Sequence, residues 1–274
     1  MISLDTVRRD HLTSYGYGRD TMPRLDALAR QSAVFDNAYA QDTNTNPSHA
    51  SMFTGLYPHV HGSRYNGQCL NDGELTLAEI LEESGYATGA FVSGFTMTAR
   101  ASCLDQGFAR YDDNFDGHRR DGWTTTDLAL EWLDERRNSE PYFLFLHLYD
   151  AHGPYLPPGN YSKLFASHDP GPPVTPPNYQ TVAAPGHVPE EGLNGYVDRY
   201  DGMLRFMDDA LDVLLDSIDL ERTVVVVLAD HGETLGERHR QLDHGGQVFD
   251  EQIGIPLVIH APGMEHRRIG AAVE

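Results

Sequence analysis

A carboxylate and an imidazole follow directly after the most apolar segment of the chain. Residues 223–229 read TVVVVLA, and Asp230, His231 and Gly232 come next. A continuous run of β-branched residues is typical of a strand buried on both faces, as in a parallel sheet. In open α/β sheets, ligands bind beyond the carboxyl ends of the strands, where an Asp–His pair suits a divalent cation. The alternative is that Asp230 caps the following helix and His231 is merely exposed.

Two more predicted strand ends carry side chains of the same kinds. The opening segment ISL ends at Asp5, and residues 141–150 read PYFLFLHLYD and are followed by His152. Because the carboxyl ends of parallel strands meet at one edge of a sheet, these groups can converge there. A strand-end aspartate is also a common helix cap, and a histidine on an apolar strand, such as His147, is most often a satisfied core residue.

A predicted helix start supplies the hydroxyl group that this set lacks. The polar stretch 41–46 contains Thr45 and leads into Pro47, after which an apolar helix is expected. A hydroxyl residue before a helix normally caps it. The same position suits a nucleophile, because the helix dipole and the unpaired N-terminal amides stabilise an anion. The residue types therefore predict either a cap or an attacking group.

The elements that must hold these residues alternate between strands and helices. Helical patterns begin near Pro23 and Pro47 and cover residues 76–85, 123–137 and 197–220. Strand patterns cover residues 2–4, 87–93, 141–150, 223–229 and 255–259, and a further apolar segment begins at Val34. This order predicts one α/β domain with a doubly wound, mostly parallel sheet flanked by helices. Residues 1–5 resemble the end of a strand and no terminating element is expected at 270–274, so we expect truncation at both ends.

A long segment without clear periodicity interrupts this alternation. Residues from about 154 to 192 are rich in proline and glycine. A loop of this length within a compact domain usually has a function. We expect an excursion over the active face that helps to define the substrate, within a single catalytic domain over residues 1–274.

Composition narrows the class of protein. The formal net charge is −21, which argues against a nucleic-acid-binding protein, because such a protein needs a basic face. No apolar stretch approaches the roughly 18 residues that a membrane span requires, and we expect no signal peptide among the given residues. Cys69 and Cys103 are too few for a zinc–thiolate site. We expect them to be small buried hydrophobic residues and not a disulfide framework.

Several motifs, taken in chain order, resemble those of the sulfatases, a family within the alkaline phosphatase superfamily. They cover almost the whole chain and read LDTVRRDHL (4–12), NAYAQ (37–41), PSHASMFTGLYP (47–58), TLAE (76–79), DAHGPY (150–155), ADHGE (229–233) and the Pro256 strand that ends at Pro262-Gly263. The resemblance implies an alkaline phosphatase-like fold and metal-dependent ester chemistry.

Carried over residue by residue, the resemblance implies a divalent cation (Zn²⁺, Mn²⁺ or Ca²⁺). Its ligands would be Asp5, Thr45, Asp230 and His231. Thr45 would also occupy the position of the nucleophile.

The same resemblance assigns the substrate contacts. His152 would contact the transferred group or the leaving oxygen, and His244 would fall where relatives place a lysine or histidine on the substrate oxyanion. Asn66 is expected to contact the same oxyanion. His49 stands where an arginine usually follows the Pro-Ser pair and is expected to bind substrate. The other histidines of interest are expected to be structural or to support the ligands: His59, His61, His147 and His239.

Two features of the sequence depart from the family pattern and bear on the reaction. Sulfatases carry a cysteine or serine that is oxidised to formylglycine, whereas Thr45 cannot yield that aldehyde, so no formylglycine is expected. Threonine here, and Asp-His in place of the Asp-Asn of many sulfatases, resemble the relatives that transfer phosphate. The sequence therefore predicts metal-dependent hydrolysis of a phosphate or phosphonate ester, with a small-molecule, glycan or lipid ester as substrate.

Three alternatives stay open. One is a sulfate-ester hydrolase that uses threonine without formylglycine. Another is a transferase that moves a phospho-group to an acceptor alcohol. The last is a catalytically degenerate homologue that retains the fold and the cation.

Overall fold

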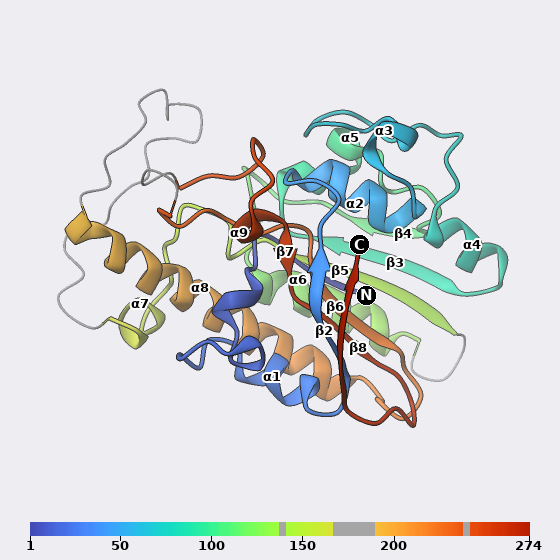
Figure 1. Cartoon of the computed structure of the whole chain (residues 1–274). Coiled ribbons are helices and arrows are strands. Elements are labelled where there is room, and N and C mark those ends of the chain that lie inside the picture. The colour runs from blue at the N-terminus through green and yellow to red at the C-terminus, as the bar shows by residue number, and fades with distance from the viewer. Residues whose placement is uncertain (137–140, 167–189, 238–241) are drawn as a thin grey trace.

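The computed structural model describes residues 1–136, 141–166, 190–237 and 242–274 (Figure 1), without the side chains of residues 190–192. The strands are β1 (Ile2–Leu4), β2 (Ala33–Tyr39), β3 (Ala87–Val92), β4 (Arg110–Asp112), β5 (Tyr142–Leu148), β6 (Val225–Ala229), β7 (Gly254–Ile255), β8 (Leu257–His260) and β9 (Arg267–Val273). The helices are α1 (Pro23–Ala29), α2 (Thr45–Thr54), α3 (Pro58–His61), α4 (Leu77–Glu83), α5 (Ala99–Ser102), α6 (Gly122–Asp134), α7 (Tyr161–Leu164), α8 (Glu190–Ser217) and α9 (Asp250–Ile253).

The described strands form one mixed sheet in the order β4-β3-β5-β1-β6-β8-β2-β7, and β9 pairs with β2. Strands β4, β3, β5, β1 and β6 are mutually parallel, whereas β8 is antiparallel to β6 and β2. Ser3 of β1 lies in register with His147 of β5 and Leu228 of β6. The mostly parallel, doubly wound sheet that the sequence predicts is confirmed, and its three central strands end at one edge.

Helices cover both faces of the sheet (Figure 1). Helices α1, α6 and α8 pack on one face, and α2 and α4 pack on the other. Side chains of β5 alternate between the two cores, with Leu144, Leu146 and Leu148 facing α8 and Phe143 and Phe145 facing α2. Within the described residues, no helix combines the length and the apolar character that crossing a membrane requires.

The predicted elements agree with the structure except at some boundaries. Thr76 and Glu79 form the expected capping box of α4. The long helix α8 begins at Glu190 instead of residue 197, and Pro256 divides the last predicted strand into β7 and β8. Residues 267–273 form β9, so the expectation of no terminating element near residue 270 is wrong. Of the predicted excursion over residues 154–192, positions 167–189 lie outside the described residues.

The expectation for the two cysteines is also wrong. Cys69 and Cys103 form a disulfide with a Cα–Cα distance of 4.9 Å, and Cys69 is exposed. The bond joins the loop after α3 to the end of α5, which are separated by 34 positions in sequence. This proximity depends on how the loops pack against one another, and no local pattern in the sequence indicates it.

Candidate active site and cation site

Three predicted ligands meet where β1 and β6 end. Asp5 follows the last residue of β1, and Asp230 and His231 follow β6. One potential ligand atom from each lies within 4.8 Å of the others, and all three residues are fully buried. Burial, and then the negative charge of Asp230, raises the pKa of Asp5 well above its usual range. Two carboxylates this close are unfavourable in a buried site unless a positive charge or a proton lies between them.

Thr45 brings its hydroxyl to the same group from the start of helix α2. It is the first residue of α2, and the residue before it, Asn44, makes no side-chain capping bond. Within the part of the chain that the structure describes, the buried Thr45 hydroxyl has no hydrogen-bond partner of normal geometry, so it is not a helix cap. It lies beside the carboxylate of Asp5, on which it acts to lower the pKa. The structure thus brings all four predicted ligands together.

The unsatisfied atoms of these residues fit a cation. Asp5 Oδ1, Thr45 Oγ1, Asp230 Oδ2 and His231 Nε2 are buried and have no hydrogen-bond partner among the described residues. His231 Nδ1 donates to the carbonyl of Gly232 at 2.9 Å, so Nε2 carries a lone pair in the neutral ring. Nε2 lies 3.4 Å from Asp230 Oδ2, so two atoms that can only accept hydrogen bonds face each other. A shared divalent cation stabilises such a pair of facing acceptors, and the mixed O/N donor set is one that divalent ions accept.

Backbone donors fix the carboxylate of Asp230. The amides of Thr6 and His231 both donate to Oδ1, at 3.2 and 2.8 Å, which leaves Oδ2 directed toward the other ligands. Thr6 adopts a left-handed conformation with φ of 57°, which is uncommon for a threonine and places its N–H toward Asp230. Ser48 Oγ donates to the carbonyl of Asp230 at 2.6 Å and ties α2 to this turn.

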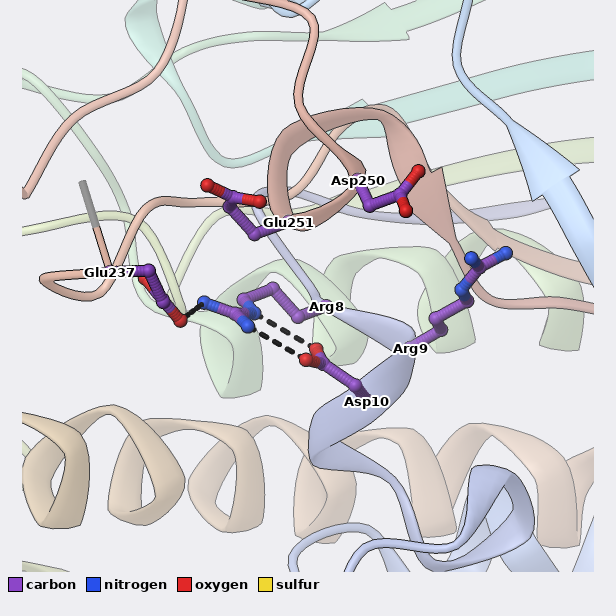
Figure 2. A pocket seen from close by; sticks show the side chains of 6 residues that line it. All are labelled: Arg8, Arg9, Asp10, Glu237, Asp250 and Glu251. Carbon is purple, nitrogen blue, oxygen red and sulfur yellow. Dashed lines mark hydrogen bonds and ion pairs between the residues drawn. The ribbon is translucent and has the colours of Figure 1, made fainter.

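Arg8 joins the segment after β1 to the segment after β6. Its guanidinium lies between Asp10 and Glu237 (Figure 2) and donates to the carbonyl of Glu233 at 3.1 Å. The six residues drawn in Figure 2 line a cavity of about 380 Å³, but none of the four cation ligands is among them. We therefore assign Arg8 a structural role and do not place the chemistry in this cavity.

Two further imidazole rings lie next to the ligand His231. The ring centroid of His244 is 4.4 Å from that of His231 and 5.0 Å from that of His152. His152 stacks on Tyr149 at 4.2 Å, and its Nδ1 donates to the carbonyl of Gly153. His152 and His244 are each less buried than the ligands, although only 8% of the His244 side chain is exposed.

Glu233 distinguishes His244 from His152. Its carboxylate lies 3.2 Å from His244 Nδ1 and accepts a hydrogen bond from the Tyr155 hydroxyl. Burial acts to lower the pKa of His244, but the charge of Glu233 raises it overall. Burial, and then the charge of His244, lowers the pKa of His152 to about 3. Such a pair is biased toward one protonated and one neutral ring, which suits separate acid and base roles.

The sequence did not lead us to predict Glu233 as a residue of the site. The signal that was available is its position two residues after His231, in the same turn at the edge of the sheet.

Asn66 lies at the entrance to α2. Its Oδ1 accepts from the amide of Asn46, the residue after Thr45, and the amide of Gly67 donates back to Asn46 Oδ1. The Asn66 residue is exposed, so it lies at the rim of the site, as a residue that contacts a substrate would.

His49 differs from the other predicted substrate contacts. It is fully buried, and its two ring nitrogens contact Ser3 Oγ and the carbonyl of Thr45, each at 2.8 Å. The structure therefore does not present His49 to a substrate. His147 lies behind the ligands, with Nε2 3.2 Å from Asp5 Oδ2. Of the remaining histidines, His61 contacts Ser51, His59 is exposed, and His239 lies outside the described residues.

Comparisons with known proteins identify the family of the chain. The sulfatase family model matches residues 1–273. The ulvan-active sulfatase of Formosa agariphila is 26% identical over an alignment that covers 92% of this chain and 54% of that protein. The chain thus spans about half the length of the curated relatives it matches.

Solved structures share the fold. The phosphonate monoester hydrolase of Agrobacterium radiobacter superposes with a TM-score of 0.80 at 21% identity, covering 98% of this chain and 69% of that one. The C-terminal periplasmic domain of EcEptC from Escherichia coli, solved in complex with Zn, gives a TM-score of 0.73 at 19% identity and covers 96% and 72% of the two chains.

Proposed function

The chain belongs to the sulfatase family, within the alkaline phosphatase superfamily, and we propose that it is the catalytic part of a metal-dependent hydrolase of phosphate or phosphonate esters. The observation that carries the proposal is the hydroxyl of Thr45. It is buried without a normal hydrogen-bond partner, starts helix α2 and adjoins the Asp5 carboxylate. A hydroxyl in this position can act as a nucleophile once its pKa is lowered.

The identity of the nucleophile separates phosphorus from sulfur chemistry. A threonine side chain has no primary carbinol or thiol that could be oxidised to the aldehyde of formylglycine. Its hydroxyl can instead attack phosphorus directly. The structural similarity to a phosphonate monoester hydrolase is consistent with this choice but reflects the fold alone.

The ligand residues and two further histidines, His152 and His244, have separate roles. When bound by Asp5, Thr45, Asp230 and His231, a divalent cation lowers the pKa of the Thr45 hydroxyl and polarises a non-bridging oxygen of the substrate. Thr45 Oγ1 loses its proton to solvent and bonds to phosphorus, while the bond from phosphorus to the leaving oxygen breaks.

The two further histidines then handle protons. His244, held by Glu233 at Nδ1, donates a proton from Nε2 to the leaving oxygen. Water next attacks the phosphothreonine, the bond between phosphorus and Thr45 Oγ1 breaks, and His152 Nε2 accepts a proton from that water. Thr45 Oγ1 takes up a proton from solvent, the phosphorus acid leaves, and proton exchange with solvent returns His152 and His244 to their starting states. Asn66 at the rim donates from its side-chain amide to an oxygen of the transferred group.

Replacing the nucleophile tests the proposal. Thr45→Ala is expected to lower metal-dependent turnover of an aryl phosphate or phosphonate by about 10³-fold or more. Thr54→Ala is the matched control, because Thr54 lies at the other end of α2 and donates to the Ala50 carbonyl. Acid quenching during turnover followed by peptide mass spectrometry should locate a phosphoryl group on Thr45. Equal turnover by Thr45→Ala and wild type would show that this residue is not the nucleophile.

A sulfate-ester hydrolase is the second candidate, and the match to sulfatases over the whole chain favours it. A panel of aryl phosphate monoesters, phosphate diesters, phosphonates and sulfates separates the two. Turnover of the sulfate at a kcat/KM well above that of every phosphorus ester would replace the first proposal with the second.

A further inference from the structure

His49 lies between the helix that carries the nucleophile and the strand that carries a cation ligand. It belongs to α2, one helical turn after Thr45, and its side chain faces β1. The ring is fully buried and packs edge-on against Phe145 and His147, with centroid distances of 5.8 and 5.1 Å. These contacts with Phe145 and His147 restrict the orientation of the His49 ring.

The partners of His49 determine where its hydrogen lies. The Thr45 carbonyl can only accept, so Nδ1 must carry a hydrogen and donate it across 2.8 Å. A charged ring is costly in a fully buried position, so the ring is neutral and Nε2 has a lone pair. Ser3 Oγ, 2.8 Å from Nε2, therefore donates to it. Both ring nitrogens are used in these two bonds.

These two bonds connect the nucleophile to a ligand strand. Ser3 and Asp5 are two positions apart around the end of β1, so their side chains point to the same face of the sheet, the face that α2 covers. His49 holds the Thr45 peptide against that face. His147, in register with Ser3, approaches Asp5 Oδ2 at 3.2 Å and supports the same carboxylate.

The alternative role for His49 is that of a second cation ligand. His49, His147 and Asp230 have ligand atoms within 4.8 Å of one another, and His49 Nδ1 lies 3.7 Å from Asp230 Oδ2. A ligating Nδ1 would need a lone pair, which it lacks while it donates to Thr45. The hydrogen-bond pattern therefore favours a positioning role over a ligand role.

We propose that His49 is a positioning residue that, through Ser3 Oγ and the Thr45 carbonyl, sets the distance between the Thr45 hydroxyl and the Asp5 carboxylate. This rests on the proposed function where it concerns turnover, but the placement of the ligands is independent of which ester is hydrolysed. Residues that orient ligands in this way typically change metal affinity or activity by 10–100-fold when removed.

The direct test of the proposal is the tautomer of His49. In protein labelled with ¹⁵N-histidine, and assigned with a His49→Gln variant, two-bond ¹H–¹⁵N spectra should show His49 as the Nδ1–H tautomer. A hydrogen on Nε2 instead would overturn the proposal. This measurement needs neither a substrate nor a cation.

The second test is a series of variants. For each variant, the Mn²⁺ affinity is measured by calorimetry, and kcat and KM are measured separately. His49→Ala is expected to weaken Mn²⁺ binding and lower kcat by about 10–100-fold each, with KM changed little. His49→Asn, whose amide can still donate to the Thr45 carbonyl, should recover part of both losses. Ser3→Ala, which leaves the ring in place, should show a smaller loss in the same two quantities. His61→Asn, at a buried histidine that contacts the Ser51 hydroxyl, is the control and should change neither.

The outcomes separate this proposal from the proposed function. A raised KM with unchanged kcat and Mn²⁺ affinity in His49→Ala would make His49 a substrate contact and overturn the proposal. If His49→Ala does not fold, Ser3→Ala decides, and wild-type Mn²⁺ affinity and kcat in that variant count against the proposal. If the wild type hydrolyses no ester, the proposed function fails, whereas the tautomer and the Mn²⁺ affinities still decide the role of His49.

Discussion

Supplying a divalent cation to metal-free protein should raise its stability markedly. The four buried atoms without partners, on Asp5, Thr45, Asp230 and His231, belong to the folded state only, because three remote segments bring them together. A ligand that binds only the folded state stabilises it by RT ln(1 + [L]/Kd), or about 2.7 kcal/mol at a free concentration of 100 Kd. For a domain of this size, about 1 kcal/mol raises Tm by roughly 2–4 °C, so a shift of about 5–10 °C is expected.

The measurement is thermal unfolding by circular dichroism after chelator treatment and dialysis. Mn²⁺, Zn²⁺ and Ca²⁺ are titrated separately, and the dependence of Tm on free cation gives the affinity. Asp230→Asn should abolish the shift, because the amide nitrogen or neutral oxygen replaces the charged Oδ2 beside His231 Nε2. Asp208→Asn, the same substitution at a buried position on α8, should retain the shift.

Two results would refute the reasoning. One is a wild-type Tm that none of the three cations raises at millimolar concentration. The other is an equal rise in wild type and in Asp230→Asn, which would place the bound cation elsewhere on this acidic chain.

Two further predictions concern stability and the support of the site. Burial raises the pKa of Asp208 to about 7, so the folded state holds this proton more tightly than the unfolded state and stability is lost as pH rises from about 4 to 7, by at most about 4 kcal/mol. Urea unfolding across that range should show a weaker pH dependence for Asp208→Asn, and an unchanged slope would contradict the assignment. A Cβ at Gly94 would lie 2.5 Å from the ring of Tyr149, which stacks on His152. Gly94→Ala should therefore lose about 1–3 kcal/mol of stability and lower kcat, whereas Gly18→Ala, with open space around it, should do neither.

The positions of the residues proposed as cation ligands could be predicted from sequence because their signals are local, whereas the ligand role itself is implied by the family resemblance. A run of apolar residues that stops at Asp230, or a short apolar segment that stops at Asp5, marks a strand end, and strand ends in a parallel sheet share an edge. Thr45 is marked in the same way by Pro47, which fits the first turn of a helix. Each of these signals lies within a few residues of the side chain it identifies.

The bonds that support the site could not be predicted, because their partners are remote. Ser3 meets His49 across 46 positions, and the disulfide joins cysteines 34 positions apart. Strand β9 could not be predicted for a related reason. Its residues are mostly exposed and include two arginines and a glycine, so pairing with β2 defines the strand, and an apolar pattern does not.

The disulfide also affects how activity should be sought. Cys69 is exposed and lies three positions after Asn66, on the loop that reaches the entrance of α2. A reducing agent such as dithiothreitol can reach that bond, and its sulfur atoms also compete for Zn²⁺. Assay buffers that contain such thiols would reduce the disulfide and also lower the concentration of free Zn²⁺, so turnover should first be measured without them.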